Sequence, residues 1–187
     1  MKRVFIVHGW GGSPEMNWLP WLQKELEARS FEVHVPGMPD PDTPRIEVWV
    51  SKLAQEVGQP DSNTYFVGHS IGSQTILRYL EQIDTAIGGV LHVAGWFTLN
   101  LEPEEETIAQ PWLTTPINYE KIKHVAPKMI ALFSEDDPSV PLENKDLFEQ
   151  RLQAKTIIEK NAGHFTGEED GRTEYPIILE SFLSLAQ

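Results

Sequence analysis

Gly68-His69-Ser70-Ile71-Gly72 is the stretch that decides the fold, and it directly follows the apolar run Thr64-Tyr65-Phe66-Val67. This order predicts a buried strand, then a sharp turn that carries a serine, then the start of a helix. In a G-x-S-x-G turn the serine is strained, and the two glycines let the strand and the helix pass closely. The pattern alone is weak evidence, because a glycine-flanked serine that caps a helix has the same sequence.

The composition is that of an ordinary globular domain. The 187 residues are 40% hydrophobic and include six tryptophans, so we expect one domain over 1–187 with a full core. No run approaches the roughly 18 consecutive apolar residues that span a membrane. The absence of cysteine excludes disulfides, thiolate catalysis and cysteine-bound metal. The sequence starts with a strand pattern at 2–7 rather than a signal peptide, so we expect a cytoplasmic protein.

The charge of the chain excludes several classes of partner. A formal net charge of −13 argues against nucleic acid and against an anionic membrane surface, because both require clustered Lys and Arg. Acidic residues gather at 102–106 and 168–170. A solvated surface is the simpler interpretation of both runs. The alternative is that the first run borders the active site and repels anionic substrates.

Short β-branched runs alternate with amphipathic segments, which predicts an α/β fold with a parallel sheet and helices on both faces. Strands are expected at 3–8, 31–35, 63–68, 87–94, 128–134 and 155–159, and helices at 17–29, 44–57, 71–83, 142–153 and 174–185. Thr43-Pro44 is interpreted as an N-cap followed by proline at the first helical position. Residues 95–120 fit neither period, and we interpret them as a short, partly helical cap loop.

Two later segments supply partners for the serine. A serine hydroxyl is activated when a histidine takes its proton and an acid fixes the tautomer of that histidine. Asp137 and His164 each follow a predicted strand, and Ser70, Asp137 and His164 stand in the chain order of the α/β-hydrolase fold. Asp136 is the alternative acid. Asp137 is favoured because it precedes Val140 in a D-x-x-V-P arrangement that is common for this acid in the superfamily.

The other histidines are assigned structural roles. His69 is expected to support the turn, and His34 and His92 are expected to be satisfied groups on strands, whereas His124 is expected to be exposed. No H-x-x-H or H-E-x-x-H spacing supports a metal site. The sequence therefore predicts neither a metal nor a cofactor.

The oxyanion of an acyl-transfer reaction needs two backbone N–H donors. We expect one from Ile71, directly after the serine, and one from Trp10 in the glycine-rich loop 8–12. An ordinary βα turn is the simpler interpretation of that loop, and it lacks the G-K-[ST] of a phosphate-binding loop. Most aromatic residues fill cores. Trp96 and Trp112 nonetheless lie on loops at the predicted carboxyl face, and we expect them to line an apolar substrate pocket.

The chain resembles the small α/β-hydrolase-fold serine hydrolases that include bacterial YdeN and mammalian retinoblastoma-binding protein nine. The similarity runs over nearly the whole chain and rests on His8-Gly9, 18–22, Met38-Pro39-Asp40-Pro41, 68–72, Pro111-Trp112, Asp136-Asp137-Pro138 and Gly163-His164-Phe165. The resemblance implies a minimal fold of about six parallel strands in the order 2-1-3-4-5-6, with the site at the switch point. It also implies Ser70, Asp137 and His164 as nucleophile, acid and base.

These observations predict a serine hydrolase that acts on a small neutral or apolar ester, or on an amide or thioester, through an acyl-enzyme. The alternative is a hydrolase-fold protein that serves mainly as a protein-binding module with vestigial activity, although the sequence indicates no protein partner. A complete triad weighs against that alternative, because a pure binder has no need of one. A third interpretation uses the same site for acyl transfer. Fold alone does not decide among them.

Overall fold

The computed structural model describes residues 1–168 and 171–187. Six strands form one parallel sheet in the order β2-β1-β3-β4-β5-β6. The strands are β1 Arg3–Val7, β2 Glu32–His34, β3 Thr64–His69, β4 Gly89–Val93, β5 Met129–Ser134 and β6 Lys155–Glu159. This topology confirms the predicted α/β-hydrolase fold and its strand order.

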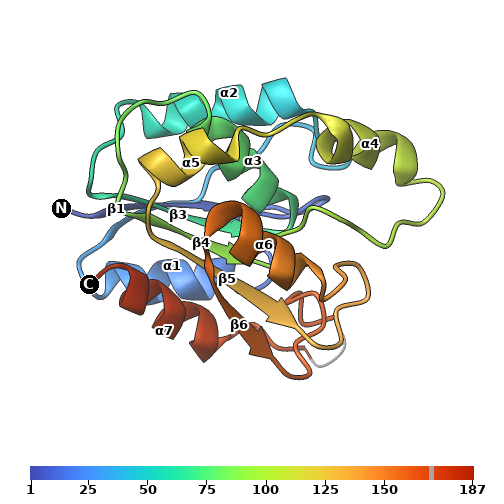
Figure 1. Ribbon diagram of the computed structural model, residues 1–187. Coiled ribbons are helices and arrows are strands. Elements are labelled where there is room, and N and C mark those ends of the chain that lie inside the picture. Colours follow the sequence, from blue (N-terminus) through green and yellow to red (C-terminus); the bar gives the residue numbers. More distant parts are fainter. Residues whose placement is uncertain (169–170) are drawn as a thin grey trace.

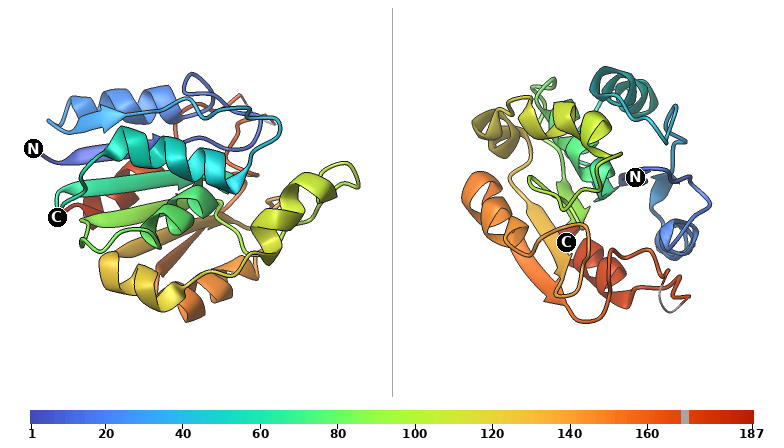
Figure 2. Two further views of the ribbon diagram at one scale, coloured as in Figure 1. Left: turned by 90° about the horizontal axis from the view of Figure 1, so that it is seen from above. Right: turned by 90° about the vertical axis from the view of Figure 1, so that its right-hand side faces the viewer.

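Helices cover both faces of the sheet, as Figure 1 shows. They are α1 Leu19–Glu27, α2 Ile46–Val57, α3 Ile71–Leu80, α4 Glu106–Thr114, α5 Tyr119–Val125, α6 Asn144–Leu152 and α7 Pro176–Leu185. Helices α2, α3, α5 and α6 lie on one face, and α1 and α7 lie on the other (Figure 1). Helix α4 projects beyond the carboxyl ends of the strands (Figure 2). No helix in the described ranges is long and apolar enough to cross a membrane.

Burial is most complete in the central strands and in α3. Every residue of β3, β4 and β5 is buried, whereas the edge strands β2 and β6 are only partly covered. Every residue of α3 is buried as well. A central strand of a parallel sheet is covered on both faces, which explains the continuous apolar runs of these strands. The turn between β3 and α3 is therefore held by buried elements on both sides.

The predicted N-cap of α2 is wrong. The helix begins at Ile46 rather than at Pro44, and Arg45 takes the cap position with extended backbone and no side-chain cap hydrogen bond. The carbonyl of Pro44 instead accepts a hydrogen bond from Trp112 Nε1 at 3.0 Å. This contact joins Pro44 to α4, and no local signal in the sequence contains it.

The segment at 95–120 is partly helical, as its interpretation required. It contains α4, which includes Pro111, and it leads into α5, whose N-cap Asn118 accepts a hydrogen bond from the N–H of Lys121 at 3.0 Å. Helix α4 is anchored from α3, because buried Arg78 donates to the carbonyl oxygens of Trp112 and Thr115. That this segment acts as a cap over the site stays a prediction.

Candidate active site

Ser70 lies at the sharp turn between β3 and α3. Its backbone angles are φ 52° and ψ −119°, a conformation that non-glycine residues rarely adopt. Its N–H donates a hydrogen bond to the carbonyl of Val93 at the end of β4, at 2.9 Å. The buried strand and helix that flank Ser70 hold this strain, which is the geometry of a nucleophile elbow. Its hydroxyl is thereby presented at the carboxyl end of the sheet.

The two glycines of the turn are required by space. A Cβ at Gly68 would lie 2.7 Å from the backbone nitrogen of Ser73, and a Cβ at Gly72 would lie 2.3 Å from the carbonyl oxygen of Val7. Both distances are shorter than real Cβ contacts. Because the clashing atoms belong to the backbone, neither clash can be relieved by a side-chain rotation. The G-x-S-x-G pattern therefore reflects close packing of α3 against β3 and β1.

His164 and Asp137 form a closely bonded pair. His164 Nδ1 lies 2.8 Å from Asp137 Oδ2, and the Asp137 side chain is only 2% exposed. The other carboxylate oxygen, Oδ1, accepts hydrogen bonds from the N–H groups of Ser139 and Val140, both at 2.9 Å. Because a carboxylate only accepts, Nδ1 of His164 carries the proton and Nε2 is left as the basic nitrogen. This is the arrangement that a general base requires.

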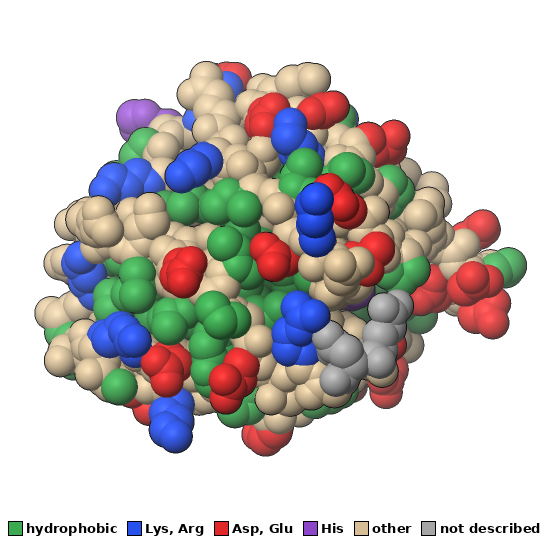
Figure 3. Space-filling view, turned by 90° about the horizontal axis from the view of Figure 1, so that it is seen from below, with side chains coloured by type: hydrophobic (Ala, Val, Ile, Leu, Met, Phe, Trp, Pro, Cys, Tyr) green, Lys and Arg blue, Asp and Glu red, His purple; other side chains and the backbone are tan. Residues whose placement is uncertain are grey.

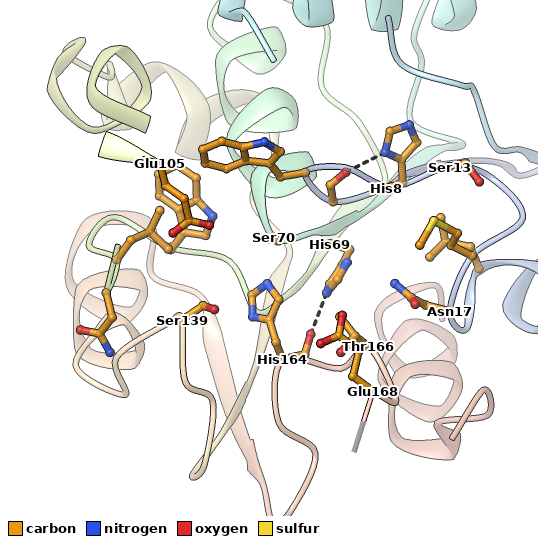
Figure 4. A pocket seen from close by; sticks show the side chains of 18 of the residues that line it. His8, Ser13, Asn17, His69, Ser70, Glu105, Ser139, His164, Thr166 and Glu168 are labelled. Atoms are coloured by element: carbon orange, nitrogen blue, oxygen red, sulfur yellow. Dashed lines mark hydrogen bonds between the residues drawn. The ribbon is translucent and has the colours of Figure 1, made fainter. Parts of the chain in front are cut away.

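Ser70 and His164 line the same cavity, and the imidazole of His164 lies beside the serine (Figure 4). The structure contains no hydrogen bond between the Ser70 hydroxyl and His164. Such bonds in substrate-free enzymes are often long and tighten only when substrate binds. The structure thus brings the three predicted residues together, with the acid–base pair already bonded.

Asp136 points away from the imidazole. Its Oδ1 accepts hydrogen bonds from the Ser134 hydroxyl at 2.5 Å and from the N–H of Gly163 at 3.1 Å. These hydrogen bonds, the first from Ser134, lower the pKa of the Asp136 carboxyl. The Ser134 hydroxyl also accepts from the N–H of Ala162 at 3.1 Å. Asp136 therefore fastens the loop after β5 to the loop that carries His164, and the geometry favours Asp137 as the acid.

His8 fixes the glycine-rich loop after β1. Its Nε2 accepts a hydrogen bond from the N–H of Met38 at 3.0 Å, so the protonated Nδ1 donates to the carbonyl of Gly9 at 2.8 Å. The N–H of Gly11 donates to Pro41, and Trp10 Nε1 donates to Asp42. His8 was predicted only as the first residue of this loop and not as the side chain that holds it. The signal that was available is a histidine at the end of a buried strand, directly before the loop.

The two predicted oxyanion donors are free to donate hydrogen bonds to a ligand. In the described part of the chain, the backbone N–H groups of Trp10 and Ile71 have no hydrogen-bond acceptor. Ile71 is the first residue of α3, where an N–H has no partner within the helix. A Cβ at Gly9 would lie 3.6 Å from Ser70 Cβ, so the loop before Trp10 approaches the serine closely. Their role as an oxyanion hole stays a prediction.

The cavity at Ser70 has a volume of about 280 Å³ and combines apolar and polar walls (Figure 4). Its apolar part is formed by Trp10, Met16, Leu19, Trp96, Leu99 and Leu101. Trp96 lines this cavity, and its role in binding substrate stays a prediction. Trp112 does not line this cavity, and that prediction is wrong. Its indole is 1% exposed, packs edge-on against Trp49 and donates to Pro44, so it joins α4 to α2.

Two carboxylates lie on the wall of this cavity, from Glu105 and Glu168, and no Lys or Arg of the described ranges lines it. Figure 3 shows acidic side chains gathered on the projection at one end of the molecule, where the loop before α4 lies. The first acidic run therefore borders the site, as the alternative interpretation held. In the second run, Glu168 lines the cavity and 169–170 lie outside the described residues.

The other three histidines, His34, His92 and His124, lie outside this cavity. His34 stacks on Phe5 with ring centroids 4.8 Å apart, and His124 is exposed. His92 is completely buried and neither ring nitrogen has a hydrogen-bond partner, so the expectation of a satisfied group is wrong there. Burial lowers the pKa of His92 to about 3 and keeps its ring neutral. Among the described residues, no cluster of three His, Asp or Glu side chains is suited to bind a metal.

The chain is similar to known proteins over nearly its whole length. The family model described as serine hydrolase matches residues 4–184. The chain is 33% identical to YdeN of Bacillus subtilis (strain 168) over 186 residues, which cover 98% of this chain and 95% of that protein. It is 32% identical to the serine hydrolase RBBP9 of Rattus norvegicus, over 89% of each chain. The crystal structure of the ydeN gene product superposes with a TM-score of 0.90 at 31% identity, covering 99% of this chain and 98% of the other.

Proposed function

The chain belongs to the serine hydrolase family, and from this premise we propose that it hydrolyses small neutral or apolar carboxylic esters through an acyl-enzyme on Ser70. One observation carries the proposal. A buried Asp137 carboxylate holds the imidazole of His164 in the basic tautomer, on the cavity that also contains the strained Ser70. A nucleophile, a base and an orienting acid are the minimum that acyl transfer to serine requires.

In the acylation half of the reaction, Ser70 Oγ attacks the acyl carbon and His164 Nε2 takes the hydroxyl proton. The negative charge then moves to the former carbonyl oxygen, where the N–H groups of Trp10 and Ile71 stabilise it. Asp137 stabilises the positive imidazolium through its bond to Nδ1. When the tetrahedral intermediate collapses, the bond to the leaving oxygen breaks and His164 gives its proton to that oxygen. The alcohol leaves and the acyl group remains as an ester of Ser70.

The deacylation half uses water as the nucleophile. His164 takes a proton from the water as its oxygen attacks the acyl carbon, and the same two N–H donors hold the oxyanion. Collapse then breaks the bond to Ser70 Oγ, and His164 returns the proton to the serine. The products are a carboxylic acid and the free enzyme, so no cofactor is consumed.

The walls of the cavity support the substrate class. A volume of about 280 Å³ suits a small ligand, and the apolar side is lined by side chains such as Trp96 and Leu99. Glu105 and Glu168 on the same wall disfavour an anionic substrate. Amides and thioesters share the same acyl chemistry. The acidic composition argues against a nucleic-acid substrate. We place the activity in the cytoplasm, because a chain without cysteine has no disulfide of the kind that secreted proteins use.

The test is covalent labelling with a fluorophosphonate, read by intact mass, together with turnover of p-nitrophenyl butyrate. Wild type should gain one label and hydrolyse the ester, whereas Ser70→Ala should gain none. Turnover by Ser70→Ala and His164→Ala should fall by about 10³-fold or more. Ser51→Ala, at an exposed position of α2, is the matched serine control and should behave as wild type.

Two outcomes would contradict the proposal. If Ser70→Ala retained near wild-type turnover, another residue would be the nucleophile. If folded wild type were neither labelled nor active, the chain would lack an activated serine, and partner binding would be the function to examine next.

A further inference from the structure

The ring of His69 lies where three loops of the candidate site meet. His69 is the residue before Ser70, so it belongs to the turn itself. Its Nε2 lies 2.8 Å from the backbone carbonyl oxygen of His164, which is 95 residues away in the chain. Its Nδ1 lies 2.9 Å from the place that a Cβ at Gly9 would occupy, in the loop after β1. One imidazole therefore contacts the nucleophile turn, the base loop and the predicted oxyanion loop.

The direction of the hydrogen bond follows from its partner. A carbonyl oxygen only accepts, so Nε2 of His69 carries the proton and donates. Burial, and then the nearby His164, lower the pKa of His69 to about 3, so the ring stays neutral in this tautomer. The side chain is 2% exposed, and Trp18 packs edge-on against it with ring centroids 5.8 Å apart. The donor is thus fixed in one orientation.

The other ring nitrogen of His69 makes a histidine unfavourable for stability at this position. Nδ1 of His69 is buried and has no hydrogen-bond partner. A buried polar atom that is left unpaired destabilises the folded state, because it loses its hydrogen bonds to water. An apolar ring would fill the same space without that cost. What an apolar ring would lack is the bond from Nε2 to His164, so the bond is the feature that the histidine adds.

We propose that His69 is a positioning residue, whose hydrogen bond to the carbonyl of His164 sets the distance between the general base and Ser70. The proposal rests on the proposed function, since it assigns a role within the same reaction. The Asp137 bond fixes the imidazole of His164 from its Nδ1 side, whereas the His69 bond fixes its backbone. Together the two bonds hold the ring and the main chain of the base. No direct bond to Ser70 is needed in the substrate-free state.

The expected effect is on chemistry rather than on binding. A displacement of about 1 Å in a catalytic group can cost about 10²-fold in rate. Loss of the His69 bond should therefore lower kcat and the rate of fluorophosphonate labelling together. KM should change little, because His69 is only 2% exposed and the side chains of Trp96 and Glu105 stay on the cavity wall.

The experiment compares two amide side chains of different length at position 69. In His69→Gln the side-chain nitrogen stands as many bonds from the backbone as Nε2 does, so it can still donate to His164. In His69→Asn the nitrogen stands where Nδ1 was and cannot reach that carbonyl. We expect His69→Asn to lower kcat by about 10-fold or more with KM within about twofold. We expect His69→Gln to recover most of that loss.

His92→Gln and His92→Asn are the matched controls. His92 is equally buried and neutral, but its ring contacts Phe148 and lies outside the cavity. These variants should lose stability and keep the kcat of wild type per active site. The final extent of fluorophosphonate labelling gives the concentration of active sites. Because kcat is calculated from that concentration, an unfolded fraction does not lower it. If His69→Asn does not fold, His69→Phe supplies the variant without a donor.

The outcomes separate this proposal from the previous one. Equal kcat values for wild type, His69→Asn and His69→Gln would overturn the role of His69 while leaving the serine mechanism intact. An equal loss of kcat in His69→Asn and His69→Gln would also overturn it, because the proposal requires that the longer amide, which reaches the carbonyl of His164, restores kcat. A wild type that is folded but unlabelled and inactive would instead contradict the proposed function.

Discussion

The backbone N–H of Met38 donates a hydrogen bond to Nε2 of His8 at 3.0 Å, inside the core. This nitrogen can accept only while it is unprotonated, so the contact requires a neutral ring. Burial lowers the pKa of His8, and it lowers those of His69 and His92 to about 3. The glycine-rich loop beside Ser70 is therefore held by a group that must stay neutral.

The lowered pKa values of His8, His69 and His92 predict that the free energy of unfolding decreases as the pH falls below about 6.5. Below about pH 6.5 the unfolded chain binds protons at these rings, whereas the folded chain does not until the pH approaches the lowered values. Their contribution is fully present above pH 6.5 and is lost progressively toward pH 3. His69 and His92 together should remove about 2 to 3 kcal/mol of unfolding free energy between pH 6 and 5. Urea denaturation at pH 7.5, 6 and 5 measures this slope.

The control for that slope is His92→Gln, which removes one of the three titrating rings. Its unfolding free energy should fall less steeply between pH 6 and 5, by about 1 kcal/mol per pH unit. A wild-type stability that does not change from pH 7.5 to 5 would contradict the neutral state assigned to these rings.

Asp137→Asn and Asp136→Asn form a matched pair at adjacent positions. At Asp137 the amide no longer stabilises the imidazolium of His164, and kcat should fall by about 10³ to 10⁴-fold. At Asp136 the amide oxygen can still accept from Ser134 and Gly163, so kcat should fall by a few-fold at most. Steady-state turnover of p-nitrophenyl butyrate by the two variants shows which of the two aspartates is the acid. A larger loss at Asp136 would reverse the assignment of the acid.

Much of this architecture could be predicted from the sequence, because the deciding signals are local. The buried runs of β3 and β5 are continuous, and the glycines at 68 and 72 are required by backbone contacts that any such turn makes. Loops that follow parallel strands meet at one edge of the sheet. The predicted grouping of Ser70, Asp137 and His164 therefore needed the strand positions, together with the strand order that the family resemblance implies.

The features that could not be predicted depend on contacts between distant segments. The carbonyl of Pro44, just before α2, accepts a hydrogen bond from Trp112 on α4. Helix α4 contains Pro111, which disfavours a helix locally, and is anchored by Arg78. The same contacts bury Trp112 away from the cavity. The periodicity of a sequence describes one segment at a time and carries no information about contacts between distant segments.

Gly72→Ala tests how tightly α3 is packed against β1. The added Cβ would lie 2.3 Å from the carbonyl oxygen of Val7 and 2.8 Å from that of His8, so the backbone must move. We expect a loss of about 1 to 3 kcal/mol in unfolding free energy and a slower rate of Ser70 labelling. Gly37→Ala is the control, since its nearest atom would be 3.8 Å away. If both variants were as stable as wild type, the close approach of α3 and β1 would be wrong.

The carboxylates of Glu105 and Glu168 predict discrimination by charge. p-Nitrophenyl butyrate and p-nitrophenyl hemisuccinate are alike in length, but the second ends in a carboxylate, which both glutamates repel. We expect kcat/KM to be about 10-fold lower for the hemisuccinate at low salt. The difference should shrink in 0.5 M NaCl, because salt screens charges at a solvated cavity wall. Equal values for the two esters at low salt would show that these carboxylates do not select substrate.

Glu105→Gln and Glu104→Gln locate the source of that discrimination. Both residues belong to the loop before α4, but only Glu105 lines the cavity, whereas Glu104 is exposed. Glu105→Gln should raise kcat/KM for the hemisuccinate by a few-fold and leave the butyrate unchanged, because only the anion loses a repulsion. Glu104→Gln should change neither value by more than about twofold, since its charge is more strongly screened. If the two variants had the same effect, the overall charge of the loop would be responsible, and Glu105 would have no specific place in the substrate site.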